Sequence, residues 1–172
     1  QMAMALTKLY KDDNSKSYIA NIDKIITTGS YLYKSVYDDF KKTFSKELQT
    51  CYGVTEVGGS ITYTNKVERK SFEDSAGKFD NEIKFKLEGN RKEPVKIIIK
   101  TPFMMSGYFR NGKKFSGIKN GYFNTGDIGY IENQKLYITG RKSDLIKKGR
   151  EFISVNQIEN ILMQSNVVSE LC

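Results

Sequence analysis

Residues 22–56 read IDKIITTGSYLYKSVYDDFKKTFSKELQTCYGVTE, and this stretch decides the fold that we expect. Residues 22–26 contain three isoleucines and end at small residues, and we interpret them as a short buried strand. Along residues 32–44 an apolar side chain recurs every four positions, which predicts an amphipathic helix with Ser30 as its cap. Residues 48–52 predict a second strand. Strand, helix and strand in this order are typical of a parallel α/β layer, and this stretch would form its edge.

The apolar pattern in the middle of the chain predicts strands. Residues 83–87 alternate apolar and charged side chains, as in a half-buried strand, and residues 95–99 are a denser apolar run after a turn at residues 89–91. Residues 128–138 predict a hairpin that turns at residues 132–134. The middle of the chain is therefore expected to be mostly β.

Helices are expected near both ends of the chain. Residues 2–11 show loosely helical spacing of apolar side chains. Residues 152–155 predict a strand, and residues 156–164 predict a short helix whose apolar face holds Ile158, Ile161 and Leu162. Together the elements predict an α+β fold.

The composition excludes several classes of site. The 172 residues contain no histidine, which excludes histidine-based catalytic triads, imidazole metal sites and histidine general bases. The two cysteines, Cys51 and Cys172, are too few for a disulfide framework or a zinc site, so a reducing, cytoplasmic location is expected. No apolar stretch is long enough to predict a transmembrane helix. The length fits one domain or two small ones.

The chain is strongly basic. It has 28 Lys and Arg against 20 Asp and Glu, a net charge of +8, and the excess lies in residues 110–120 and 141–150. An anionic partner is therefore expected, and charge alone leaves nucleic acid, a membrane surface and a phosphorylated small molecule open. The sequence begins at Gln1 rather than at methionine and ends soon after the last expected helix, so we expect it to be a fragment of a longer protein.

Three short segments combine residue types that carry chemistry. Residues 52–56 place an aromatic ring, a glycine turn, a hydroxyl and a carboxylate where a strand ends, and ligands bind at such ends in α/β layers. In residues 124–127 an acid beside glycine could accept hydrogen bonds from two vicinal ribose hydroxyls. Residues 140–149 are basic between two glycines. The alternatives are an ordinary strand end, an Asx turn and a solvated basic linker, respectively.

Taken in this order, the segments resemble motifs of the adenylate-forming superfamily, which includes acyl-CoA synthetases, peptide-synthetase adenylation domains and firefly-luciferase-like enzymes. Residues 52–56 match YGxTE, residues 125–127 match TGD and residues 140–149 match GRxxDxIKxxG. A fourth motif, IxxxEIE, is matched with Gln157 in place of its first glutamate, at Ile153, Ile158 and Glu159. The resemblance extends from about residue 22 to the C-terminus.

Two further stretches are similar in a looser way. Residues 103–109 look like the MxGYW-type stretch that precedes TGD in the family, and residues 28–32 look like its GGAPL adenine loop. The resemblance implies that Gly29, Ser30 and Gly53 lie at the nucleotide.

The resemblance also implies how the chain is divided. Residues 1–57 would end the α/β layer of a large domain, residues 58–140 would form a β-rich, barrel-like subdomain, and residues 141–172 would contain the hinge and the start of a small, mobile α+β lid domain. The family's upstream phosphate loop with its lysine and its downstream Gly-Lys segment are not in this sequence. The isolated chain is therefore expected to be inactive and to need the N-terminal part of the same enzyme.

The resemblance implies a two-step ligase reaction. A carboxylic acid, fatty or other, reacts with ATP and Mg²⁺ to give an acyl-AMP, and the thiol of coenzyme A or of a carrier protein then takes the acyl group. Tyr52 would stack on adenine, Thr55 would hydrogen-bond the α-phosphate and Glu56 would hold Mg²⁺, since a hard cation prefers a carboxylate oxygen. Asp127 would bind both ribose hydroxyls, and Arg141 would reach the same sugar.

Two positions concern the second step. The family's hinge lies two residues beyond the motif arginine, where this chain has Ser143 and the family usually has Asp or Lys. A small polar residue can still absorb a change of φ and ψ. Gly149 would lie on the loop that meets the pantetheine arm of coenzyme A, where the backbone must approach the ligand closely.

A function of a different class also remains open. A non-catalytic module could bind single-stranded nucleic acid by stacking bases on aromatic rings and contacting phosphates with lysines. The candidate residues for this are Tyr108, Phe109, Tyr122, Phe123, Lys113, Lys114 and Lys119. In the ligase interpretation the same cations face ATP, pyrophosphate and coenzyme A, or are solvated.

Overall fold

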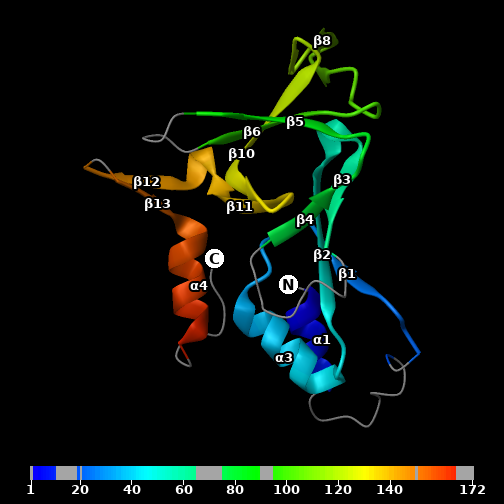
Figure 1. Ribbon diagram of the computed structural model, residues 1–172, viewed down its shortest axis with the longest axis vertical. Helices are drawn as coiled ribbons and strands as arrows, with labels where there is room; N and C mark the ends of the chain where they lie inside the picture. Colours follow the sequence, from blue (N-terminus) through cyan, green and yellow to red (C-terminus); the bar gives the residue numbers. More distant parts are fainter. Residues whose placement is uncertain are drawn as a thin grey trace.

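The structure is a computed structural model that describes residues 2–10, 19, 21–64, 75–89, 95–149 and 151–165. Most strands within these residues belong to one mixed sheet: β1 (Ile25–Thr27), β2 (Leu48–Val54), β3 (Gly59–Tyr63), β4 (Ser75–Phe79), β5 (Lys84–Glu88), β6 (Lys96–Lys100), β9 (Ile118–Lys119), β10 (Tyr122–Glu132) and β11 (Lys135–Arg141). Their order across the sheet is β1-β2-β3-β4-β11-β10-β6-β5, with β9 paired to β10 (Figure 1).

The expected strand–helix–strand unit is confirmed. β1 runs parallel to β2, and α3 (Lys34–Phe44) lies between them in the chain. Tyr37, Phe40 and Phe44 of α3 pack with Leu48 in a buried cluster, because residues three and four apart share one face of a helix. The expected N-terminal helix is α1 (Met2–Tyr10), which packs beside α3 (Figure 1).

Two expectations about this unit are wrong. The residue that caps α3 is Tyr33 rather than Ser30, and its side chain makes no capping hydrogen bond. The first strand begins only at Ile25, and Ile26 is 50% exposed. The physical reason is that β1 is at the end of the sheet and, among the described strands, has a neighbour on one side only.

The expected hairpin of β10 and β11 is confirmed and lies at the centre of a second core. The two strands turn at Asn133 and Gln134, which both have positive φ, as two-residue hairpin turns require. β6 pairs with the other side of β10 and contributes the fully buried Ile97 and Ile99. These two side chains and Leu136 of β11 form the middle of this core.

The β-rich part does not form a closed barrel within the described residues, so the barrel-like expectation is wrong for them. β1 and β5 are the two ends of the sheet and do not pair with each other. β5 was expected to be half buried, but all of its residues are exposed, including Phe85 at 41% and Leu87 at 39%. An edge strand has one uncovered side, and sequence alternation cannot reveal which strand is at the edge. The turn expected at residues 89–91 lies mostly outside the described residues.

The C-terminal region contains the expected strand and helix. β12 (Leu145–Lys148) and β13 (Glu151–Ser154) form a two-stranded ribbon, and α4 (Val155–Gln164) follows. The expected apolar face of α4 is exposed in the described part of the chain, at Ile158, Ile161 and Leu162. A second ribbon, β7 (Tyr108–Arg110) and β8 (Lys113–Phe115), projects from one end of the molecule (Figure 1).

Two short 3₁₀ turns complete the described structure: η2 (Thr55–Val57) and η4 (Lys142–Asp144). None of the described helices is both long enough and apolar enough to cross a membrane. Cys172 and Arg150, one of the two cysteines and one cation of the basic stretch at residues 141–150, lie outside the described residues.

Candidate functional site

A bulge in β10 positions an acidic side chain. β10 pairs with β6 at Asn124 and again at Ile128, and the register shifts between these residues. Gly126 has a φ of 79°, and its N–H donates to Asn124 Oδ1 at 3.1 Å, so the Asx turn considered above is present. The bulge removes residues 125–127 from the ladder with β6, and Asp127 is only 5% exposed. The turn and the buried acid are thus parts of one feature.

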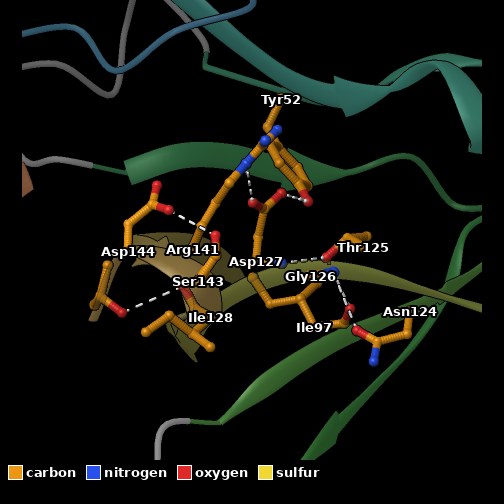
Figure 2. Close-up of polar contacts among 11 residues, drawn as sticks. Tyr52, Ile97, Asn124, Thr125, Gly126, Asp127, Ile128, Arg141, Ser143 and Asp144 are labelled. Atoms are coloured by element: carbon orange, nitrogen blue, oxygen red, sulfur yellow. Dashed lines mark hydrogen bonds and ion pairs between the residues drawn. The ribbon is translucent and has the colours of Figure 1, made fainter. Parts of the chain in front are cut away.

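Both carboxylate oxygens of Asp127 have a donor. The Tyr52 hydroxyl donates to Oδ2 at 2.7 Å, and Arg141 Nε donates to Oδ1 at 3.2 Å (Figure 2). The three side chains come from β10, β2 and β11, and Asp127 and Arg141 are directly opposite in the ladder. A buried carboxylate needs such partners. Because each of its oxygens can accept two hydrogen bonds, Asp127 can also accept from a ligand.

The Tyr52 hydroxyl is a permanent donor at neutral pH. Burial, and after it the negative charge of Asp127, raises the pKa of Tyr52 above its ordinary value. The hydroxyl therefore keeps its proton and orients the carboxylate, while the half-buried ring lines a cavity.

A cavity of about 430 Å³ lies where these strands meet the C-terminal region. Ligand pockets commonly have volumes of about 300–1,000 Å³. Six of the residues expected at the nucleotide line it: Gly29, Ser30, Tyr52, Gly53, Asp127 and Arg141. Asp144 of η4 and Asn156 of α4 line it as well, so the C-terminal region forms part of the wall. The fold therefore brings together residues that are about 100 positions apart in the sequence.

The other expected residues lie outside this cavity. Glu56 lines a second cavity of about 560 Å³, which shares Val54 and Arg141 with the first. Thr55 is exposed and lines neither cavity. Gly149 is exposed beyond the end of β12, has a φ of 63° and also lines neither. The expected set is thus divided between two adjoining cavities, the exposed Thr55 in η2 and the turn of the β12–β13 ribbon.

Gly53 permits the close approach of β2 and β3. A Cβ on Gly53 would lie 1.8 Å from the carbonyl oxygen of Gly59, which no side chain tolerates. The register of β2 and β3 shifts between Tyr52 and Gly53, immediately before η2 begins. The glycine therefore sets the relative positions of the tyrosine and of the turn that carries Glu56.

Glu56 has the chemistry of a magnesium ligand. No group of three or more Cys, Asp or Glu side chains that could hold a metal occurs in the part of the chain that the structure describes. A single carboxylate still fits Mg²⁺, which proteins often bind through one or two carboxylates together with substrate phosphates and water. The Tyr108 hydroxyl donates to Glu56 Oε1 at 2.9 Å, and Oε2 accepts no hydrogen bond from the described residues. One oxygen therefore remains for a cation.

A hydrogen bond joins α4 to the loop beside the first cavity. The Tyr33 hydroxyl donates to Glu159 Oε2 at 2.6 Å. Tyr33 directly follows residues 29–32, which line the cavity. Burial, and then the hydrogen bond to Glu159 and its negative charge, raises the pKa of Tyr33 to about 12.

We expect the Tyr33 bond to be lost only at strongly alkaline pH. Because the pKa is raised in the folded state, the unfolded chain releases this proton first. The contribution of this hydrogen bond to the stability of the folded state is therefore complete below the ordinary pKa of 10.0 and is lost as the pH rises through about 12. The difference in tyrosinate absorbance between the wild type and Tyr33→Phe should have its midpoint near 12, and Glu159→Gln should lower that midpoint. A midpoint near 10.0 would mean that the bond does not exist in solution.

The aromatic residues considered for nucleic-acid stacking do not form one exposed platform. Phe123 is buried at 6% exposure, and Lys86 Nζ lies 4.0 Å from the ring centroid of the half-buried Tyr122. Tyr108 and Phe109 are exposed but are consecutive in a strand, so they point to opposite faces of the β7–β8 ribbon.

Sequence reasoning missed several residues of the site. The motif resemblance implies no role for Asp144, and Asn156 has no signal in the sequence because its place in the wall depends on how α4 packs. The contact of Tyr108 with Glu56 spans 52 positions and depends on the path of the chain between them. The role of the Tyr52 hydroxyl was also missed, because only its ring was considered.

Curated relatives match between about two thirds and nearly all of the chain and are themselves much longer. No family model matches. The chain is 36% identical over 126 residues to a 2-succinylbenzoate–CoA ligase of Bacillus subtilis (strain 168), across 69% of this chain and 26% of that protein. It is 31% identical over 172 residues to the ligase of the same name from Geobacillus sp. (strain WCH70), across 96% of this chain and 35% of that protein. The chain thus spans about a quarter to a third of the length of these relatives.

Solved structures share the fold. An O-succinylbenzoate coenzyme A synthetase from Bacillus subtilis, in complex with ATP and magnesium ion, superposes with a TM-score of 0.76 at 26% identity, over 98% of this chain and 36% of that chain. An anthranilate CoA ligase in complex with anthranoyl-AMP gives a TM-score of 0.78 at 18% identity, over 96% and 32% of the two chains, which is a likeness of fold alone.

Proposed function

Because this chain belongs to the adenylate-forming superfamily and corresponds to a C-terminal portion of its CoA ligases, we propose that it is part of an ATP-dependent ligase that joins a carboxylic acid to coenzyme A. One observation carries the proposal: the buried Asp127, held by Tyr52 and Arg141, lies at a cavity of about 430 Å³. A fixed carboxylate with spare acceptor capacity suits a pair of vicinal hydroxyls, as on the ribose of ATP.

In the first step the carboxylate of the acid would attack the α-phosphorus of ATP. A bond forms between the acid oxygen and phosphorus, and the bond to pyrophosphate breaks, which leaves an acyl-AMP. Asp127 would accept hydrogen bonds from both ribose hydroxyls, and Arg141 would donate to the same sugar. The Tyr52 ring would lie against adenine, beside Gly29, Ser30 and Gly53. The Thr55 hydroxyl would donate a hydrogen bond to an α-phosphate oxygen.

The second cavity suits the phosphates. Glu56 would hold Mg²⁺ jointly with phosphate oxygens, and Arg141 and Lys142 line the same cavity, so their positive charges would face these oxygens. When bound, the ion offsets the negative charge that gathers at the reacting phosphate. Glu56 and these cations require no histidine, in keeping with the composition.

In the second step the thiol of coenzyme A would attack the acyl carbonyl carbon and AMP would leave. We propose that residues 141–172 turn about a hinge at Ser143 between the first and the second step. Ser143 is exposed in η4, and its hydroxyl donates to Asp144 Oδ1 at 2.6 Å. The division into residues 1–57, 58–140 and 141–172 is part of this proposal. It would let the wall formed by Asp144 and Asn156 move away from the nucleotide between steps.

We expect Gly149→Leu to block thioester formation while leaving acyl-AMP formation nearly intact. Among the described residues, apart from its chain neighbours, no atom lies within 4 Å of a Cβ at Gly149, so we expect the added side chain to meet an incoming ligand rather than the protein. The rate of the second step should fall roughly 10- to 100-fold, which corresponds to about 1.4–2.7 kcal/mol of barrier. Pyrophosphate release and thioester formation, measured separately in the complete ligase, check this.

The matched control is Gly112→Leu. Gly112 also has a positive φ, 71°, and open space around its Cβ position, but it lies at the tip of the β7–β8 ribbon. The two leucines therefore impose similar backbone strain. An equal loss in both variants would contradict the pantetheine role of Gly149.

The acid is proposed from the relatives' names alone. Those quoted above are named for 2-succinylbenzoate, and they give no support to the fatty acid that sequence analysis included. We therefore propose an aromatic carboxylic acid of this kind, with coenzyme A as acceptor.

The test is pyrophosphate exchange by the complete ligase in which this chain occurs. Exchange of labelled pyrophosphate into ATP should require Mg²⁺ and a carboxylic acid, with 2-succinylbenzoate tried against benzoate and a long-chain fatty acid. Exchange with none of a broad panel of acids would reject the ligase function. Exchange with the fatty acid alone would reject only the proposed acid. Tight, strongly salt-dependent binding of a labelled single-stranded oligonucleotide would instead favour the nucleic-acid module.

A further inference from the structure

The turn that carries Glu56 is held by a segment far away in the sequence. Thr101 Oγ1 donates to the carbonyl oxygen of Val57 at 2.8 Å in a buried hydrogen bond. Met105 N donates to the carbonyl oxygen of Glu56 at 2.9 Å. Residues 101–105 therefore fix the backbone of η2.

Tyr108 continues this segment and reaches the side chain. Its hydroxyl donates to Glu56 Oε1 at 2.9 Å. The tyrosine is itself held from two directions: it pairs with Phe115 in the β7–β8 ribbon, and its ring lies against Gly117, where an added Cβ would be 2.9 Å from Cε2. The backbone and the ring of Tyr108 thus have contacts that do not involve Glu56.

A fixed carboxylate binds a ligand at a lower entropic cost than a free one. A glutamate side chain on the surface has several rotatable bonds, and a hydrogen bond formed before the ligand arrives reduces the freedom lost on binding. The donor occupies Oε1 of Glu56, so Oε2 stays available to a cation. Since the tyrosine donor is neutral, the negative charge of the carboxylate is kept.

We infer that Tyr108 is a positioning residue for Glu56, which it holds ready for a divalent cation bound with the phosphates of ATP. The inference rests on the function proposed above and adds to it a residue that does not itself touch the ligand. It also gives the β7–β8 ribbon, which projects from the end of the molecule in Figure 1, a role in the site.

The experiment measures ATP affinity of the complete ligase by calorimetry without acid substrate, once with Mg²⁺ and once with EDTA. Tyr108→Phe removes only the hydroxyl of a side chain that is 45% exposed. The gain in ATP affinity that Mg²⁺ provides should fall about five-fold, as for loss of one hydrogen bond to a charged group at the surface. AMP affinity and ATP affinity in EDTA should not change. The control is Tyr63→Phe, at 49% exposure, whose hydroxyl donates to Ser60 O at 3.4 Å and makes no other hydrogen bond with the described residues.

A double variant tests whether Tyr108 acts through Glu56. In a Glu56→Gln background, Tyr108→Phe should reduce the magnesium effect no further. No magnesium effect in the wild type would overturn the function proposed for Glu56. A magnesium effect that Tyr108→Phe keeps in full, or that Tyr63→Phe reduces equally, would overturn the inference and leave that function standing.

Discussion

Asp127→Ala is expected to abolish pyrophosphate formation by the complete ligase. The substitution removes acceptors for two ribose hydroxyls, and each charge-assisted hydrogen bond contributes about 1.5–3 kcal/mol, so the rate should fall about 10²- to 10⁴-fold. It also leaves the largely buried Tyr52 hydroxyl and the exposed Arg141 guanidinium without their shared partner. Initial rates of labelled pyrophosphate exchange at saturating acid measure the loss.

Ribose analogues separate this role from a general loss of structure. The wild type should use 2′-deoxyATP and 3′-deoxyATP much less well than ATP, whereas the residual activity of Asp127→Ala should hardly distinguish the three. Asp39→Ala, at an exposed position of α3, is the control and should behave as the wild type. Pyrophosphate exchange surviving intact in Asp127→Ala would falsify the ribose assignment.

The sequence predicted the members of the first cavity better than their interactions. Tyr52, Asp127 and Arg141 lie in short motifs, and a motif is local, so each could be identified without the fold. The hydrogen bonds among them span up to 75 positions, and the bond from Tyr52 to Asp127 joins β2 to β10, which are not neighbours in the sheet, so it depends on the three-dimensional course of the strands. Tyr108 could not have been connected with Glu56, because nothing in the sequence indicates where β7 runs.

The fold shows the same division between local and distant information. The helix at residues 32–44 and the hairpin at residues 128–138 were predicted because their period or turn is visible within a few residues. The exposure of Ile26 and of β5 was not predicted, because the position of a strand at the edge is a property of the whole sheet. Short strands such as β7 and β8 have no apolar alternation and gave no signal.

Gly53→Ala is expected to have the second large effect, although an alanine is a small change. The added Cβ would lie 1.8 Å from the oxygen and 2.4 Å from the carbonyl carbon of Gly59, and 2.6 Å from Ser60 Cα. All three are backbone atoms, so no side chain can rotate away, and β2 and β3 must separate at their bulge. Overpacking in a well-packed place costs about 1–3 kcal/mol or more, so we expect that loss in the free energy of unfolding, measured by urea titration of this chain.

Gly112→Ala is the control that separates a steric clash from backbone conformation as the cause of the loss in Gly53→Ala. Gly112 has a positive φ of 71°, which disfavours alanine, but no described atom blocks its Cβ position. Gly53 has no positive φ, but backbone atoms block its Cβ position. If conformational freedom were the reason for glycine, Gly112→Ala would be the more damaging variant; we expect the reverse.

Since separation of β2 and β3 displaces Tyr52 on one side of the bulge and Glu56 on the other, Gly53→Ala should also reduce pyrophosphate exchange in the complete ligase by about 100-fold, the scale expected for a misplacement of about 1 Å. A stable Gly53→Ala ligase with normal exchange would mean that the two cavities do not depend on this contact.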